Sequence, residues 1–229
     1  MESLADRVAR IEAQITAATE RAGRSRAEVD WIAVSKTVDP AQVRAAHAAG
    51  VRRFGESRAQ ELAAKRAALG DLELEWHFIG HVQTNKVREV LPLSSWIHSV
   101  DRLKLARKLA AQVPAAAPQR ILVQVNTSGE ASKSGVSPAG LPELLDALAA
   151  WPQLRVEGLM TIGPLTDDQQ AIRAAFRTLR HARDRERARQ RPGAPLGHLS
   201  MGMSGDFPIA IEEGATLLRI GTAFFGARP

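Results

Sequence analysis

The sequence contains no cysteine and no tyrosine among its 229 residues. Without cysteine the chain can form no disulfide framework, no thiolate nucleophile, no cysteine-ligated zinc site and no iron–sulfur cluster. Without tyrosine, any mechanism that needs a phenol as its acid or base is excluded. The hydrophobic fraction of 45% is nevertheless ample for a sizeable core, so disordered and collagen-like classes are excluded as well.

Long apolar runs are also absent. No run of about 18 apolar residues occurs, so the sequence predicts no membrane-spanning helix. Near the N-terminus, Leu4, Val8, Ile11 and Ile15 fall at helical spacing among charges of both signs, which is unlike a signal peptide. We therefore expect a cytoplasmic protein with no membrane partner and with an N-terminal helix over residues 1–22.

Most of the chain has no excess of positive charge, although its net charge is +6. Eight arginines between Arg173 and Arg191 stand against only Asp184 and Glu186, and the remaining residues carry 23 charges of each sign. These arginines fall on several helical faces, with Phe176 as the only interleaved aromatic residue. We interpret the segment as a solvated outer helix and predict no nucleic-acid partner. Binding to nucleic acid or another anionic surface is the alternative.

Short apolar runs alternate with alanine-rich helical segments along the chain, which favours parallel strands joined by right-handed crossovers. Eight such units predict an α/β fold, a single (β/α)8 TIM barrel over residues 30–229, with residues 1–229 forming one domain. An open doubly wound sheet is the alternative, but the turn after the first run lacks the expected glycines. The eight runs are 30–35, 53–55, 75–80, 95–100, 120–126, 155–162, 197–201 and 216–221.

Lys36 directly follows the first apolar run and is one of only six lysines among 31 basic residues. At the C-terminal tip of a buried strand its amine would lie in the barrel mouth, where partial desolvation favours the neutral form. A neutral amine can form a Schiff base with an aldehyde. The alternative is a lysine that extends from the strand end into solvent.

Two loops near the C-terminus are rich in glycine and hydroxyl side chains. Residues 200–205 (SMGMSG) follow the seventh run, and Gly221 and Thr222 follow the eighth. Barrels often bind phosphate at these two loops, where backbone N–H groups approach the anion. Either loop alone would suit a tight turn, but the pair predicts a phosphate site.

Arg219 lies within the apolar run TLLRIG, where a charge is costly to bury without a partner. Strand alternation places Leu217 and Arg219 on one face of the sheet. An arginine that points into the barrel needs an acceptor, and a core carboxylate such as Glu56 or Glu157 is one candidate.

Two histidines, His77 and His81, are four residues apart and could chelate zinc on a helix. The intervening Phe-Ile-Gly is typical of a strand end, which separates the two rings. We therefore predict no metal site.

Seven ordered motifs resemble the pyridoxal phosphate homeostasis protein family, and the resemblance extends from about Ile32 to Arg228. Membership implies a (β/α)8 barrel resembling the N-terminal domain of alanine racemase, with one pyridoxal 5′-phosphate (PLP). The motifs are AVSKT (33–37), FGES with Gln60 and Glu61, WHFIGHVQTNK (76–86), HSVDR (98–102), QVNTSGEASKSG (124–135), GLMTIGP (158–164) and HLSMGMSGDF followed by AIEEGATLLRIGTAFFGAR.

The resemblance implies that Lys36 forms a Schiff base with PLP and that Arg219 faces the pyridine nitrogen. A fixed cation there keeps the nitrogen unprotonated, so the cofactor would be held firmly and activated weakly. The phosphate would be held by Ser200, Gly221 and Thr222, with two methionines nearby. The candidate cofactor-binding residues are Lys36, Ser57, His77, Ser200, Met201, Met203, Arg219, Gly221 and Thr222.

The sequence departs from the family pattern at two positions. Ser57 stands where an asparagine is usual after FGE. Because the serine side chain is shorter, its hydrogen bond beside the cofactor ring would reach less far or be replaced by one to water. Val38 occupies a position that is often lysine, which removes a second cation from the site. Lys133 matches a family lysine and is a candidate for a role at the mouth, whereas the arginine-rich helix over 173–191 matches no motif.

We expect a PLP-binding protein that stores or delivers the cofactor with little or no catalytic activity, so we assign no catalytic residue. Apo-forms of PLP-dependent enzymes are candidate recipients, and we expect a monomer. The alternative is a PLP-dependent amino-acid racemase. Racemisation needs acid/base groups on both faces of the substrate α-carbon, and in alanine racemase these are the cofactor lysine and a tyrosine. Because this chain has no tyrosine, His77, His81 or His198 would have to substitute.

Overall fold

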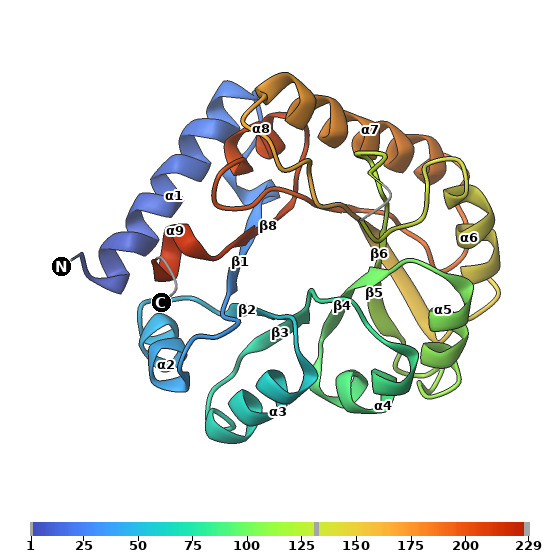
Figure 1. Ribbon diagram of the computed structural model, residues 1–229, viewed down its shortest axis with the longest axis horizontal. Coiled ribbons are helices and arrows are strands. Elements are labelled where there is room, and N and C mark those ends of the chain that lie inside the picture. Colours follow the sequence, from blue (N-terminus) through green and yellow to red (C-terminus); the bar gives the residue numbers. More distant parts are fainter. Residues whose placement is uncertain (1, 131–132, 227–229) are drawn as a thin grey trace.

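Eight parallel strands follow one another around a closed barrel, in which β8 pairs with β1 (Figure 1). The computed structural model describes residues 2–130 and 133–226. Each of the eight apolar runs overlaps one strand, so the predicted (β/α)8 barrel is confirmed and the open sheet is wrong. The strands are β1 (Asp30–Val34), β2 (Arg53–Glu56), β3 (Glu75–Phe78), β4 (Trp96–Val100), β5 (Gln119–Gln124), β6 (Leu154–Met160), β7 (His198–Ser200) and β8 (Leu217–Ile220).

A helix follows every strand, and an additional helix, α1, precedes β1. A capping box formed by Ser3 and Asp6 begins α1, and its buried Ile11 and Ile15 face the core. The helix packs beside α8 and α9, as Figure 1 shows. Helix α1 lies within residues 1–22, where the sequence predicts an N-terminal helix. Met1 lies outside the described residues. The helices are α1 (Leu4–Arg21), α2 (Pro40–Ala48), α3 (Ala59–Ala68), α4 (Val87–Val90), α5 (Leu103–Ala110), α6 (Leu141–Leu148), α7 (Gln169–Arg187), α8 (Phe207–Glu212) and α9 (Thr222–Phe225).

The core has two layers, because successive side chains of a strand point to opposite faces. The larger layer fills the space between the strands and the surrounding helices, and Leu218 and Ile220 of β8 belong to it. A smaller cluster that contains Leu217 fills part of the barrel interior. The alternation predicted for the last run is therefore confirmed, and Arg219 points to the interior.

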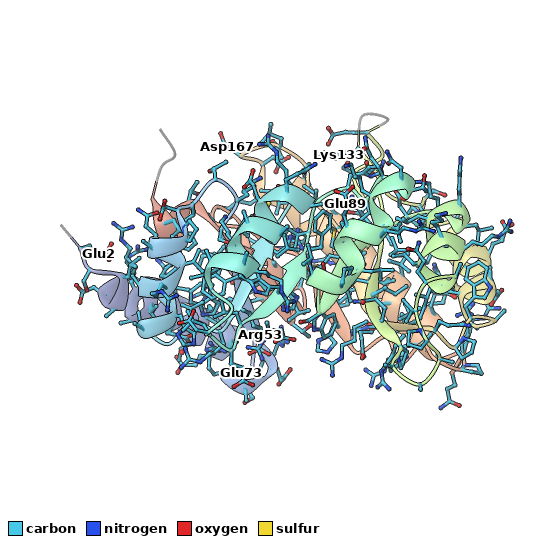
Figure 2. The ribbon with its side chains drawn as sticks, turned by 90° about the horizontal axis from the view of Figure 1, so that it is seen from below. Glu2, Arg53, Glu73, Glu89, Lys133 and Asp167 are labelled. Atoms are coloured by element: carbon cyan, nitrogen blue, oxygen red, sulfur yellow. The ribbon has the colours of Figure 1, made fainter. Side chains whose placement is uncertain are left out.

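Charged side chains at the N-terminal end of the barrel are neutralised by one another. The Arg53 guanidinium lies 2.9 Å from Asp30 and 3.0 Å from Glu75, and Arg155 lies 2.7 Å from Glu157. In Figure 2, Arg53 lies at the end of the barrel opposite Lys133. These ion pairs close the base of the barrel, while the other end is the mouth at the C-terminal ends of the strands.

The arginine-rich segment forms α7 and the residues that follow it, on the outside of the barrel. Buried Glu213, directly after α8, lies 3.1 Å from Arg173, 3.1 Å from Arg177 and 3.2 Å from Arg180. The Arg191 guanidinium lies 2.8 Å from buried Glu186. These contacts agree with the interpretation as an outer helix and give its arginines structural partners. Among the described residues, no helix has the length and apolar character needed to cross a membrane.

Candidate functional site

A cavity of about 360 Å³ opens at the mouth of the barrel. This volume lies at the lower end of the range for small-molecule sites, which are mostly apolar with a few convergent polar groups. The apolar lining consists of Val34, Ile79, Met160, Ile162 and Met203. The remaining lining is polar or small and consists of Lys36, Ser57, Ser204, Gly205, Arg219, Gly221 and Thr222.

Lys36 reaches this cavity because it lies two residues after Val34, on the inward face of the chain that leaves β1. The next residue, Thr37, has a left-handed backbone with φ of 65°, which non-glycine residues rarely adopt. The Thr37 backbone N–H donates to the Glu61 carboxylate at 2.8 Å. This contact from α3 holds the turn that positions the lysine, at a point where local strain is typical of functional sites.

A buried polar triad supports the same strand end from outside the barrel. The Lys65 ammonium donates to Glu56 Oε1 at 2.6 Å and to the Ser35 carbonyl at 2.5 Å. The Ser35 hydroxyl donates to the same Glu56 oxygen at 2.6 Å. Burial raises the pKa of Glu56, and the hydrogen bonds from Lys65 and Ser35 oppose that shift. The triad ties the residue before Lys36 to β2 and α3.

Arg219 of β8 is 4% exposed and lies at the floor of the mouth cavity. Its guanidinium donates to Ser200 Oγ at 2.6 Å and to the Thr161 carbonyl at 2.8 Å. Burial lowers the pKa of Arg219 to about 10, partly opposed by the charge of Asp206, so the group remains cationic at neutral pH.

The core carboxylates considered as partners of Arg219 bind elsewhere, so that pairing is wrong. Glu56 binds Lys65, and Glu157 binds Arg155 at 2.7 Å. Within residues 2–130 and 133–226, no carboxylate forms an ion pair with Arg219. A buried cation with only neutral hydrogen-bond acceptors can stabilise an electron-rich group in the cavity beside it.

The two loops predicted to bind phosphate meet at the cavity. Ser204 Oγ, in the loop after β7, accepts hydrogen bonds from the Gly221 N–H at 3.2 Å and the Ala223 N–H at 3.1 Å, where α9 begins. The turn needs glycine at position 202, because its φ is 92° and a Cβ there would lie 2.6 Å from the Ala210 Cβ. This turn brings Ser204 back over β8.

The cavity brings together six of the nine residues predicted to bind a cofactor, as its lining shows. The other three lie beneath it. Ser200 is buried and accepts a hydrogen bond from Arg219, and Met201 is fully buried in the outer core. His77 is 1% exposed inside the barrel, where its Nδ1 lies 2.9 Å from His98 Nε2.

Besides the apolar lining, Ser204 and Gly205 line the cavity without being among the nine predicted residues, although they belong to the glycine and hydroxyl loop over 200–205. The sequence alone indicated the loop but not which serine faces the cavity. Ser57 does line the cavity, and Val38 is half-buried against the outer core.

A second cavity, of about 260 Å³, adjoins the first, because Ile79 and Ile162 line both. Its lining includes His81, Asn126 and Lys133. The Lys133 ammonium lies 2.6 Å from the Glu130 carboxylate and donates to the Gly163 carbonyl at 2.9 Å. Lys133 therefore lies at the mouth, as predicted, but it lines the second cavity, whereas Lys36 lines the first. Ala131 and Ser132 of the same motif lie outside the described residues.

The family model described as alanine racemase, N-terminal domain, matches residues 7–229. The pyridoxal phosphate homeostasis protein of Pseudomonas aeruginosa is 50% identical over 229 residues, which covers 100% of this chain and 97% of that protein. The protein of the same name from Escherichia coli K12 is 42% identical, covering 100% of this chain and 98% of that protein.

Solved structures agree with this relationship. The structure of PipY from Synechococcus elongatus with PLP bound has a TM-score of 0.85 and 38% identity, and covers 98% of this chain and 100% of that chain. Alanine racemase from Corynebacterium glutamicum has a TM-score of 0.72 with 19% identity, covering 96% of this chain and 61% of that chain. At that identity the racemase shows the shared barrel fold alone.

Proposed function

The chain belongs to the pyridoxal phosphate homeostasis protein family, and we propose that it binds PLP in the mouth cavity and holds it for other proteins. Lys36 would hold the cofactor covalently through its amine, with loss of water from the aldehyde. PLP supplies, when bound, an aldehyde carbon and a pyridine ring that can accept electrons. The chain's own residues then determine whether that chemistry leads to turnover.

The residues of the cavity fit PLP in three respects. Lys36 supplies an amine at the tip of β1. Arg219 is a buried cation with two neutral acceptors, which suits an electron-rich ring nitrogen. The N–H groups of Gly221 and Ala223 converge on the Ser204 oxygen, and donors in that arrangement suit a phosphate oxygen.

The observation that best supports a carrier is the scarcity of proton-transfer groups. Of the side chains that line the mouth cavity among the described residues, only Lys36 and Arg219 are titratable. The Arg219 pKa of about 10 keeps its proton in place at neutral pH. Lys36 is then the single group that could add or remove a proton, whereas racemisation needs one on each face of the reacting carbon.

The histidines considered as substitutes for a tyrosine do not supply the second group in the mouth cavity. His77 and His198 lie within the barrel on β3 and β7, and neither lines the cavity. His81 lines the adjoining cavity instead. A PLP-dependent racemase is therefore the less favoured function.

Two assays on the PLP-loaded protein distinguish the functions. Incubation with L-alanine should yield no D-alanine above the rate of free PLP, and addition of an apo-enzyme that requires PLP should restore that enzyme's activity. Lys36→Ala is the variant that should lose the carried cofactor, and His81→Asn is the control for the only histidine near the mouth among the described residues. D-alanine formation at ordinary enzymatic rates, about 1 s⁻¹ or faster, would contradict the proposal.

A further inference from the structure

A chain of side-chain contacts crosses the barrel interior from the floor of the mouth cavity toward the base. The Arg219 guanidinium donates to Ser200 Oγ at 2.6 Å, and Ser200 Oγ lies 3.1 Å from His98 Nδ1. The other nitrogen of that ring, Nε2, lies 2.9 Å from His77 Nδ1. The chain ends where His77 Nε2 lies 3.9 Å from the Glu75 carboxylate. Four strands, β8, β7, β4 and β3, contribute these residues.

Hydrogen-bond chemistry gives this chain one direction. A guanidinium only donates, so the Ser200 oxygen accepts from Arg219 and its hydroxyl hydrogen can go to His98 Nδ1. His98 then carries its proton on Nε2 and donates to His77 Nδ1. His77 in turn carries its proton on Nε2, which faces Glu75. In this direction the hydrogens of Ser200 and His98 each point to an acceptor, and the hydrogen on His77 Nε2 faces an anion 3.9 Å away.

The opposite direction is unfavourable. If His98 donated from Nδ1, the Ser200 hydroxyl hydrogen would have no acceptor among the described residues. The lone pair of His77 Nε2, which has no hydrogen-bond partner in the described chain, would then face the Glu75 carboxylate 3.9 Å away. An unsatisfied buried polar group and a lone pair against an anion both cost free energy.

Burial and charge keep both rings neutral and fix the far end of the chain. Ser200 and His98 are each 0% exposed and His77 is 1% exposed. Burial lowers the pKa of His77 and of His98. The Glu75 carboxylate accepts from the Trp96 indole at 2.7 Å and from Arg53 at 3.0 Å. The chain therefore ends facing a carboxylate that is held in place at the base of the barrel.

We propose that Ser200, His98 and His77 are positioning residues that fix the Arg219 guanidinium at the floor of the cavity through a one-way hydrogen-bond chain. The chain presents the Ser200 oxygen to one end of the guanidinium, while the Thr161 carbonyl accepts from the other nitrogen. The consequence for the cofactor rests on the proposed function, but the direction of the chain is a property of the protein without PLP.

The first test uses the protein without PLP. ¹⁵N NMR of the histidine rings should find both His77 and His98 neutral, with the proton on Nε2. In Ser200→Ala, His98 should lose this preference and populate both tautomers, whereas Ser200→Thr keeps the hydroxyl and should restore it. His198→Asn is the control, because His198 bonds Thr216 and is outside the chain. A proton on Nδ1 of His98, or a cationic ring at neutral pH, would overturn the proposal.

The second test uses the loaded protein and reads the position of Arg219. Ser200→Ala should weaken PLP binding about tenfold, the effect of losing one hydrogen bond to a charged group, and should shift the pH at which the cofactor's absorption band changes. Ser200→Thr and His198→Asn should behave as the unmodified protein does. Unchanged affinity and spectrum in Ser200→Ala would overturn the positioning role. Absence of any PLP binding by the unmodified protein would contradict the proposed function and leave the NMR result standing.

Discussion

Basic side chains gather in two regions of this molecule, on α7 and at the barrel mouth, and their partners differ. On α7, three arginines surround the buried Glu213 carboxylate within 3.2 Å. At the mouth, the acceptors of Arg219 within the described part of the chain are only the Ser200 hydroxyl and the Thr161 carbonyl. A cluster of arginines can therefore have a purely structural role. A single buried cation that has no carboxylate partner is the better indication of a ligand site.

Removing the cation at the mouth gives the largest expected effect. A cation about 4 Å from a pyridine nitrogen disfavours its protonation by roughly 4 kcal/mol at an effective dielectric of 20, or about three pKa units. Arg219→Gln should raise the pKa of the bound cofactor's ring nitrogen by up to that amount. Absorbance titration of the loaded variant measures the shift. Arg173→Gln on α7 is the matched control, and an identical titration for both variants would remove the distinction between the two regions.

The next largest effect is expected from removing Glu213, the carboxylate that three arginines of α7 share. Burial raises the pKa of Glu213, but hydrogen bonds from Arg177 and Arg173 lower it more, so the side chain is charged and bound. Glu213→Gln should reduce the free energy of unfolding by about 2 kcal/mol, since three guanidinium groups lose their common anion. Urea denaturation measures this change. Glu143→Gln, at an exposed carboxylate of α6, should change stability little, and PLP binding should survive in both variants.

A falling pH should lower the free energy of unfolding through His77 and His98, the two histidines of the hydrogen-bond chain that leads to Arg219. Burial lowers the pKa of His77 and His98 in the folded protein, so below about pH 6.5 the unfolded chain binds protons that the folded chain does not. Stability is therefore retained above that pH and lost as the pH falls, by up to about 1.4 kcal/mol per pH unit for each histidine.

Urea denaturation between pH 7 and pH 5 measures this slope. His98→Asn should give a shallower loss of stability with falling pH, and His181→Asn, on the exposed face of α7, should leave the slope unchanged. Equal slopes for all three proteins would show that the interior histidines do not control acid stability.

The smallest effect is expected for binding of α7 to polyanions. Because its arginines already contact carboxylates such as Glu213 and Glu186, the loaded protein should elute early from heparin with a shallow dependence on salt. Late elution with a steep salt dependence would restore the alternative of an anionic-surface partner.

The barrel and the floor of its mouth could be predicted from the sequence because each rests on local pattern. Eight apolar runs separated by helical segments determine the order of the strands, and a parallel barrel collects every strand end on one face. Lys36 directly follows the first run, and Arg219 lies on the inward side of the last. Their meeting in one cavity follows from that topology.

The sequence could not predict which hydroxyl faces the cavity or how the interior is connected. Ser200 is the last residue of β7 and points inward to Arg219, while the left-handed turn at Gly202 carries Ser204 back to the mouth. The contact between His77 and His98 depends on the register of neighbouring strands, which no single-strand pattern determines. The sequence therefore does not show that His77 lies inside the barrel beside His98.

Reduction of the loaded protein with borohydride tests most directly which lysine holds the cofactor. The reagent converts a Schiff base into a stable secondary amine, so peptide mass mapping then locates the pyridoxyl group. We expect the group on Lys36, whose side chain lines the same cavity as Arg219. A pyridoxyl group on Lys133, or on no residue, would contradict the assignment of Lys36.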